Sequence, residues 1–428
     1  MSNESLNDVC WQKLFDKYSI LQNLESEGFF NISAAQIKEF REPRLMVKFD
    51  HANNLPKLFL DNKLTILPIT RGDYMISHFE AYHRFEASDS PITRVSLPIN
   101  IQSLDRNYIS SEAIALNCAF ASGIIADFIE DDIVFPTVSG RMGSGAFSFD
   151  IFDTQIGGAR QVCVHNSQIE IDAAYEGISC LAIFEAKRDL ADDFLTRQLY
   201  YPFRVWQSRV TKQVKPIFLV YSNGIYRLFE YAFGDINNYS SLELIKQKNY
   251  AIEDTAISLV DIQATLESAV LVNEPQIPFP QADIFERIIN LCELLSTQEL
   301  TRTDVTEKYD FDARQTNYYT DAARYLGLLE KRKENGVPSY SVSMAGKKIL
   351  QLDFKQRQLA YCSAILSHRT FNYALRLYFN SGVIPSTEKI VEIMKDSNLY
   401  QVGSDSTFIR RSSTVKGWLN WIVSLINE

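Results

Sequence analysis

The middle of the chain alternates between apolar and polar positions with a period of two, the spacing of β-strands. A Glu176-Gly177 turn separates two of these runs, and Asn223-Gly224, a strong hairpin dipeptide, separates two others. We expect strands at Ala146–Ile151, Gln168–Ala173, Cys180–Glu185, Lys215–Tyr221 and Ile225–Tyr231.

Helical signals frame these strands. Ser110-Ser111-Glu112 offers capping residues for an apolar helix that continues to about Phe128, and a second helix is expected over about Asp192–Val205. The resulting order is helix, three strands, helix, two strands. This order predicts an α/β (α+β) core with a mixed central sheet.

The parts of the chain before and after this core have different hydrophobic patterns. The first part predicts a helix over about Asp8–Glu25 and short strands at Leu45–Phe49, Lys57–Leu60 and Leu64–Ile69. Pro275, Pro278 and Pro280 suggest a linker, after which helical periodicity dominates. Helices are expected over Ile284–Leu295, Asp304–Tyr309 and Ala313–Leu326, then a hairpin turning at Asn335-Gly336, and then helices over Leu359–Leu366, Tyr373–Phe379, Ser386–Lys395 and Thr407–Leu425.

Three helices followed by a hairpin is the order of a winged helix. We therefore predict an N-terminal α+β segment and mainly helical winged-helix C-terminal domains around the α/β core. The expected divisions are an N-terminal extension for recognition or dimerisation (1–105), a catalytic core (106–240), a connector (241–281), a winged helix (282–350) and a C-terminal helix-turn-helix-like module (351–428).

Composition narrows the class of protein. The chain has 428 residues, of which 46% are hydrophobic and 22% charged, as in globular proteins. The first stretch does not resemble a signal peptide, and no run approaches the roughly 18 apolar residues of a membrane span. Six scattered cysteines without a CxxC pair argue against structural zinc and for a reducing compartment. These features predict a cytoplasmic protein without a membrane partner.

Charge is unevenly distributed. The net charge is −10, but Leu300–Glu428 contains 18 Lys/Arg and 13 Asp/Glu, a net +5, which leaves −15 for the preceding residues. A basic C-terminal part on an acidic body fits a nucleic-acid-reading tail, although many domains that bind no nucleic acid are equally basic.

The most informative chemistry lies at Asp172 and Glu185-Ala186-Lys187. Residues two apart on a strand share a face, so Glu185 and Lys187 project together while Ala186 faces the core. Charges at the end of an apolar strand are costly unless they are used. Asp172, on the neighbouring strand, would bring a second carboxylate to the same sheet edge.

These residue types suit hydrolysis with a metal ion. Mg²⁺ prefers oxygen ligands, which two carboxylates and the backbone carbonyls of 183–186 could provide. The ion would activate water, and the ammonium of Lys187 would orient that water or stabilise charge on phosphorus.

The pattern resembles the PD-(D/E)XK nuclease family, which includes many type II restriction endonucleases. Asp172 corresponds to the family's aspartate and Glu185-Ala186-Lys187 to its E-x-K, although Ile171 stands where a proline is usual. The resemblance spans about 112–233. It implies that Asp172 and Glu185 bind Mg²⁺, with Glu112 as an additional acidic ligand, and that Lys187 serves catalysis. It also likens the helix containing Gln198 and Tyr201 to the Gln/Tyr pattern that follows the lysine in several branches.

Each assignment has a simpler alternative. Glu185 and Lys187 could form an ordinary ion pair, and Glu112 could be a glutamate in the first turn of a helix, where the helix dipole stabilises its charge. Glu170 is a candidate ligand that we read as a solvated partner. Gln198 could contact DNA or simply pack. The Gly-rich run 139–145, expected as a loop, could hold a phosphate with Arg141 or be a plain turn.

Basic and amide side chains in the C-terminal part are candidates for DNA contact. The predicted recognition helix would present several, the wing would follow it, and the last helix would direct hydroxyls and cations toward a backbone. A solvated or protein-binding helical module is the alternative. The candidates are Arg314, Gln315, Asn317, Arg324, Lys331, Arg332, Arg410, Arg411 and Lys416, with the apolar positions Trp418, Leu419, Trp421 and Ile422 of the last helix expected in the core.

The sequence thus favours a type II-like restriction endonuclease that cuts double-stranded DNA at a specific site. Such an enzyme implies a cognate DNA methyltransferase as genetic partner, and double-strand cleavage suggests a homodimer. The N-terminal runs 41–50 and 69–74 also resemble the opening of some restriction endonucleases of this length. Two other interpretations are a methylation-dependent endonuclease and a winged-helix regulator with an inactive nuclease-like core.

Overall fold

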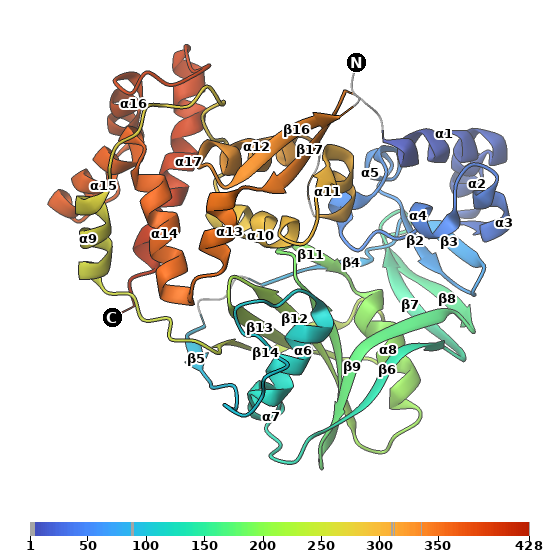
Figure 1. Ribbon diagram of the computed structural model, residues 1–428. Helices are drawn as coiled ribbons and strands as arrows, with labels where there is room; N and C mark the ends of the chain where they lie inside the picture. Colours follow the sequence, from blue (N-terminus) through green and yellow to red (C-terminus); the bar gives the residue numbers. More distant parts are fainter. Residues whose placement is uncertain (1–4, 87–89, 310, 312, 335, 428) are drawn as a thin grey trace.

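The computed structural model describes residues 5–86, 90–309, 311, 313–334 and 336–427 (Figure 1). It is a mixed α/β structure organised around a seven-stranded sheet with the strand order β5-β14-β13-β12-β10-β9-β6. The pairs β10–β12 and β14–β5 are parallel and the others antiparallel, so the predicted mixed central sheet is confirmed. Its strands are β5 (Ile92–Arg94), β6 (Phe135–Gly143), β9 (Gln168–Glu176), β10 (Cys180–Lys187), β12 (Gln213–Ser222), β13 (Ile225–Phe233) and β14 (Leu242–Ala251).

Helices cover both faces of this sheet. On one face, α6 (Glu112–Ala121) and α7 (Ile124–Ile129) pack against alternate residues of β10 and β12 in one hydrophobic cluster. The expected helix is thus divided at Gly123, which has a left-handed φ of 80°. On the other face lies α8 (Arg197–Gln207), preceded by the short strand β11 (Asp193–Leu195) rather than by helix.

The turn between β12 and β13 follows the expected chemistry. Asn223 and Gly224 have φ values of 54° and 78°, the left-handed conformations that this two-residue turn requires. The register Ser222↔Ile225 confirms the hairpin.

The predicted strand at Ala146–Ile151 exists but lies outside the central sheet. It belongs to β7 (Ala146–Asp153), which forms a two-stranded ribbon with β8 (Gly158–His165). Its inward residues Phe149 and Ile151 pack against α8 and the N-terminal part. The Gly-rich run expected as a loop between helix and strand is mostly strand: Phe135–Gly143 is β6, which pairs with β9.

The N-terminal part has its own hydrophobic cluster, centred on Trp11 and Phe59. The strands expected at 45–49 and 57–60 are wrong, because Pro43 and Pro56 begin short helices there and short apolar runs fit either structure. Its elements are α1 (Leu6–Tyr18), α2 (Ile20–Glu27), β1 (Phe30–Ser33), α3 (Ala34–Lys38), α4 (Pro43–Met46), η1 (Ala52–Asn54), α5 (Lys57–Asp61), β2 (Thr65–Pro68), β3 (Asp73–Ser77) and β4 (Tyr82–Arg84), the last of which pairs with β11.

The C-terminal part begins with three helices and a three-stranded sheet of order β15-β17-β16. Ala322, Ala323 and Tyr325 form the buried side of α12, while Asn335 of the expected turn lies outside the described residues. The elements are α10 (Phe285–Leu295), β15 (Leu300–Thr301), α11 (Arg302–Lys308), α12 (Ala313–Tyr325), β16 (Leu329–Glu334) and β17 (Val337–Val342).

Further helices complete one continuous hydrophobic core with this unit, and Trp418, Leu419, Trp421 and Ile422 lie in it as predicted. The core also includes Ile225 and Ala251 of the central sheet. Within 241–281, where sequence signals are weak, lie strand β14 and α9 (Leu259–Ser268), so this segment is more than a connector. The remaining helices are α13 (Met344–Leu350), α14 (Phe354–Leu366), α15 (Arg369–Ser381), α16 (Thr387–Lys395) and α17 (Asp405–Ser424).

In the described part of the chain, no helix has both the length and the apolar character that crossing a membrane requires.

Candidate active site

The candidate site is built on the hairpin of β9 and β10. Gly177 begins its turn and accepts no side chain, because a Cβ there would lie 2.3 Å from Oδ2 of Asp131. That same carboxylate oxygen accepts the backbone N–H of Ser179 at 3.0 Å, which fixes the turn. The turn therefore sets the register in which Ile183 faces Ala174 and Phe184 faces Ala173.

The ladder between β9 and β10 ends at the pair of Phe184 and Ala173, and at this point β9 carries a β-bulge in its pairing with β6. Opposite β6, Val138 pairs with Ala174 and Gly140 with Ile171, so two residues of β9, Asp172 and Ala173, face one residue of β6. A bulge re-aims side chains and interrupts the ladder. Here Oδ2 of Asp172 accepts the backbone N–H of Ala186 at 2.8 Å and replaces a ladder partner. The bulge thus brings Asp172 to Glu185-Ala186-Lys187.

The strand pattern places the two charges of β10 on one face. Phe184 and Ala186 belong to the cluster under α6 and α7, whereas Ile183 belongs to the opposite cluster. Glu185 and Lys187 continue the row of Ile183 and are nearly buried, with side-chain exposures of 10% and 14%. Nζ of Lys187 donates to Oε1 of Glu185 at 2.7 Å.

Two residues complete the surroundings of this pair. Nε2 of Gln198, on α8, donates to Oε1 of Glu185 at 2.7 Å, so the candidate DNA contact is a direct partner of the carboxylate. Oδ2 of Asp50 lies 3.8 Å from Nζ of Lys187. Asp50 was missed by sequence reasoning, because it lies in the N-terminal part and only long-range contacts, such as the hydrogen bond from Leu195 N to Asp50 O, show where that part meets the core.

Burial and charge act together on these groups. Burial raises the pKa of the Glu185 carboxyl to about 7, with the Asp172 and Asp50 carboxylates adding to the effect and the Lys187 ammonium opposing it. Burial also raises the pKa of Asp172, although the Ala186 N–H opposes this shift. Burial acts against the charge of Lys187, but the carboxylates of Glu185, Asp50 and Glu112 raise its pKa well above the ordinary value. The lysine therefore remains an ammonium.

Asp50 behaves differently from the other carboxylates. Burial alone would raise its pKa, but the Lys187 ammonium, followed by Lys48, outweighs burial and lowers it. Asp50 is therefore a second negative charge close to the lysine, beside that of Glu185.

Glu112 lies in the first turn of α6, after the N-cap Ser111. Burial raises its pKa, and Lys187 and Asp172 both act on it electrostatically, so it lies at the margin of the site. Among the described residues, no three His, Cys, Asp or Glu side chains gather closely enough to hold a metal ion together. The role of Glu112 as a metal ligand stays a prediction.

The donor set nevertheless fits a hard cation bound by two carboxylates. Glu185 uses Oε1 for both of its hydrogen bonds and Asp172 uses Oδ2, which leaves Oε2 and Oδ1 without a hydrogen-bond partner in the described part of the chain. Carboxylate oxygens of this kind, together with backbone carbonyls and water, are the ligands that Mg²⁺ takes.

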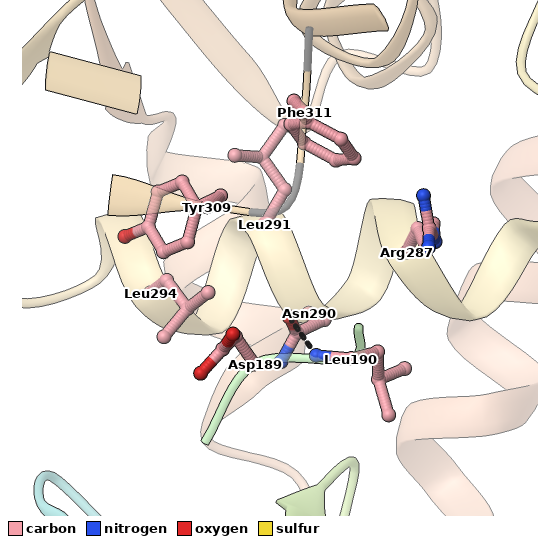
Figure 2. A pocket seen from close by; sticks show the side chains of 8 residues that line it. All are labelled: Asp189, Leu190, Arg287, Asn290, Leu291, Leu294, Tyr309 and Phe311. Atoms are coloured by element: carbon pink, nitrogen blue, oxygen red, sulfur yellow. Dashed lines mark hydrogen bonds between the residues drawn. The ribbon is translucent and has the colours of Figure 1, made fainter. Parts of the chain in front are cut away.

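The segment that follows Lys187 is held from two sides. The side-chain amide of Asn290, on α10, accepts the N–H of Leu190 at 3.1 Å (Figure 2). The same amide donates to the carbonyl of Arg188 at 2.6 Å. From the N-terminal part, Nε2 of His51 lies 2.9 Å from Oδ2 of Asp189. The histidine is therefore a structural bridge, and the end of β10 is tied to both flanking parts of the chain.

The candidate DNA contacts lie partly on the central sheet and partly in the C-terminal part of the chain. Arg141 pairs with Glu170 at 3.2 Å on the exposed strands β6 and β9, as expected for a solvated Glu170. On α12, Arg314 is exposed, Gln315 and Asn317 are half-buried, and Arg324 pairs with Asp321 at 2.7 Å.

Lys331 and Arg332 are exposed on β16, and Lys331 lies over the ring of Tyr340. Arg411 of α17 lies near Tyr318 and Asp321 of α12 and is half-buried, whereas Arg410 is exposed. The structure therefore places Arg411 of α17 beside α12.

One part of the prediction for α17 is wrong. The hydroxyl of Thr414 does not project outward, because the residue is buried and its Oγ1 donates to Oδ1 of Asp283 at 2.5 Å. Lys416 donates to Oγ1 of Thr387 at 2.7 Å, so it joins α17 to α16.

The variant Glu185→Gln tests whether the buried carboxylate destabilises the folded protein. The pKa of Glu185 is near 4.5 in the unfolded protein and about 7 in the folded protein, so the folded protein binds a proton more tightly. Protonation of Glu185 therefore stabilises the fold fully below pH 4.5, and this stabilisation is lost as the pH rises through about 7. We expect the metal-free variant to be more stable than the native protein at pH 8 by about 1–3 kcal/mol, with the difference shrinking as pH falls. Thermal unfolding in EDTA at several pH values measures it.

Adding Mg²⁺ at pH 8 should then raise the melting temperature of the native protein but not of Glu185→Gln, because a ligand of the folded state stabilises it. An ordinary ion pair predicts the reverse pattern: a less stable variant in EDTA and no response to Mg²⁺ in either protein.

Three family models match successive parts of the chain, and each is described as a domain of unknown function. They cover residues 8–76 (DUF6996), 77–251 (DUF6997) and 287–427 (DUF7226). No curated protein and no solved structure matches the chain. The second of these matches contains Asp172, Glu185 and Lys187 together with the whole seven-stranded sheet, whereas Asp50 lies in the first.

Proposed function

We propose that this protein is a Mg²⁺-dependent endonuclease of the type II restriction kind, with a PD-(D/E)XK core. The observation that supports this most is the meeting of Asp172, Glu185 and Lys187 where β9 and β10 separate. An ordinary ion pair needs neither a bulge that turns a second carboxylate toward it nor two carboxylate oxygens left without hydrogen bonds. The resemblance to the nuclease family suggested by sequence rests on the same three residues.

In this proposal Asp172 and Glu185 hold the ion. When bound, Mg²⁺ polarises the scissile phosphate and lowers the pKa of a coordinated water. Lys187 holds a positive charge beside that position, where it orients the attacking water and stabilises the charge that develops on phosphorus. Gln198 keeps Oε1 of Glu185 occupied and so directs Oε2 toward the ion. Asp50 is a second carboxylate that restrains the lysine.

The C-terminal part is proposed to read DNA. The order α10, β15, α11, α12, β16, β17 and the pairing of β15 with β17 support a winged helix with α12 as recognition helix. The exposed Arg314 of α12 and Arg410 of α17 would contact phosphates, with Arg411 between the two helices. Restriction would further imply a cognate methyltransferase, and two active sites for two strands would imply a homodimer on DNA.

Digestion of unmethylated and methylated plasmid DNA with Mg²⁺ tests the proposal. We expect discrete fragments from the native protein, none in EDTA, and a loss of at least 100-fold in rate for Lys187→Ala, because the variant lacks the ammonium beside the reacting phosphate. Fragments from methylated DNA alone would identify a methylation-dependent nuclease.

Lys212→Ala is a matched control, because Lys212 also pairs with a glutamate, Glu176, but at the other end of the same hairpin. DNA binding without cleavage of any plasmid would contradict the nuclease proposal and favour a winged-helix regulator with an inactive core.

Asp50→Asn tests the positioning of the lysine. We expect cleavage to slow by about tenfold, because the ammonium loses one of the two carboxylates that restrain it, while the stabilisation by Mg²⁺ persists. Asp61→Asn, at an exposed site in the same part of the chain, should cleave normally. A native rate for Asp50→Asn would exclude this role.

Arg314→Ala and Arg410→Ala test the DNA interface. Each should weaken binding to all sequences alike and reduce the slope of log affinity against log salt by about 1, as expected for the loss of one phosphate contact. Lys389→Ala removes an exposed cation from α16 and should leave the slope unchanged. Fluorescence anisotropy with Ca²⁺ in place of Mg²⁺ measures this without cleavage, and unchanged slopes for both arginine variants would place the interface elsewhere.

A further inference from the structure

A second site lies on the same face of the central sheet as Lys187. It is a cavity of about 210 Å³ between strands β12, β13 and β14 on one side and residues 85–86 and 190–191 on the other. Val220, which contributes to its wall, is the register partner of Lys187 on the neighbouring parallel strand. Adjacent strands lie about 4.8 Å apart, so the cavity begins one strand away from the proposed catalytic lysine.

One wall of the cavity is formed by polar side chains, some of whose atoms have no hydrogen-bond partner in the described structure. Arg227 of β13 pairs in register with Asn249 of β14, and Gln247 lies two residues along on the same face. Nη1 of Arg227, Oε1 of Gln247 and Oδ1 of Asn249 are buried and have no hydrogen-bond partner in the described structure. Asn249 is only 8% exposed, and its Nδ2 donates to the carbonyl of Ser90 at 2.9 Å, which leaves Oδ1 directed elsewhere.

Such a wall is unfavourable for the protein on its own. Each buried donor or acceptor without a partner costs about 1–3 kcal/mol, and native proteins contain few of them. Three of them in residues that line one cavity make it a candidate binding site for a ligand that supplies one acceptor and two donors.

The remaining walls are apolar apart from Glu86, whose carboxylate accepts from the hydroxyl of Tyr231 and lies 3.0 Å from Nε2 of His83. Phe85 and Phe229 lie with ring centroids 5.1 Å apart, and Val220 and Leu190 adjoin them. The cavity therefore combines an aromatic and aliphatic surface with a hydrogen-bonding edge. A flat ligand with a polar rim satisfies both, and a nucleobase has this character.

We propose that this cavity binds a nucleobase, and that guanine fits it best. Guanine O6 can accept from Arg227, while its N1–H and N2–H₂ groups can donate to the amide oxygens of Gln247 and Asn249. Contact between arginine and guanine O6 is common in DNA recognition. The base could come from a DNA strand, turned out of its stack beside Lys187, or from a free guanine nucleotide. Neither source requires that the protein hydrolyse DNA.

The test is a binding experiment in EDTA with the full chain. Saturation-transfer NMR with dGMP, dIMP, dAMP, dCMP and dTMP should give the strongest signal for dGMP and at least a fivefold weaker affinity for dIMP, which lacks the N2 amine. A thymidine 12-mer with one central guanine, compared with the same strand containing inosine, distinguishes the sources. Tighter binding of the guanine strand than of dGMP indicates a DNA base, and binding of dGMP alone indicates a free nucleotide.

Gln247→Met removes one acceptor and keeps the shape of the side chain. We expect guanine binding to weaken about tenfold while the melting temperature stays the same or rises, because the lost oxygen has no partner in the free protein. Arg227→Met is a second variant with the same expectation for binding, and Gln213→Met, at the exposed start of β12, is the control. Equal signals from all five nucleotides, or native affinity in Gln247→Met, would overturn the proposal and leave a water-filled cavity.

Discussion

The energetic constraint on which this structure depends is the burial of Glu185 and Lys187 at the end of a central β-strand. Five apolar residues, Cys180–Phe184, lead to two charges that are almost removed from water. Removing two such charges from water costs several kcal/mol per ion, whereas an apolar pair of similar volume would be tolerated. The arrangement is therefore a poor way to stabilise a sheet, and each neighbouring element contributes a group that makes it possible.

These contributions explain why three parts of the chain meet at one place. The N-terminal part supplies Asp50 and His51, α8 supplies Gln198, and α10 holds the backbone on both sides of Asp189 through Asn290. The turn of β12 and β13 is joined to the C-terminal part as well, since Glu293 accepts from Ser222 and Asn223. A displacement of α10 would thus be felt by the residues that directly follow Lys187. Under the proposed function, this connection would couple the DNA-reading part to the catalytic residues without a flexible linker between them.

Sequence periodicity identified the elements that carry their own local signal. The strands of the β9–β10 and β12–β13 hairpins, the Asn223-Gly224 turn and the helices of the C-terminal part are all present, because apolar spacing and turn residues determine them locally. The alternation of Glu185 and Lys187 with Phe184 and Ala186 also followed from strand geometry. What could not be predicted depends on long-range packing. Nothing near Asp50 indicates that it meets Lys187, and the separate ribbon of β7 and β8 has the same alternating pattern as a strand of the main sheet. The strand predicted at Lys57–Leu60 is wrong for another reason, because four residues are too few to distinguish the period of a strand from that of a helix.

The two unfavourable features of the molecule lie on one face of the sheet. Lys187 and Val220 are register partners, so the buried charges of the proposed catalytic site and the unsatisfied wall formed by Arg227, Gln247 and Asn249 are separated by little more than one strand. A protein selected only for stability has no reason to keep either, because apolar substitutions would relieve both. Groups that are strained in the free protein become favourable when a ligand supplies what they lack: a cation for the carboxylate oxygens and a hydrogen-bonding rim for the polar wall. That both deficits face the same side suggests that one extended ligand satisfies them together, and a nucleic acid strand provides a phosphate and a base at neighbouring positions.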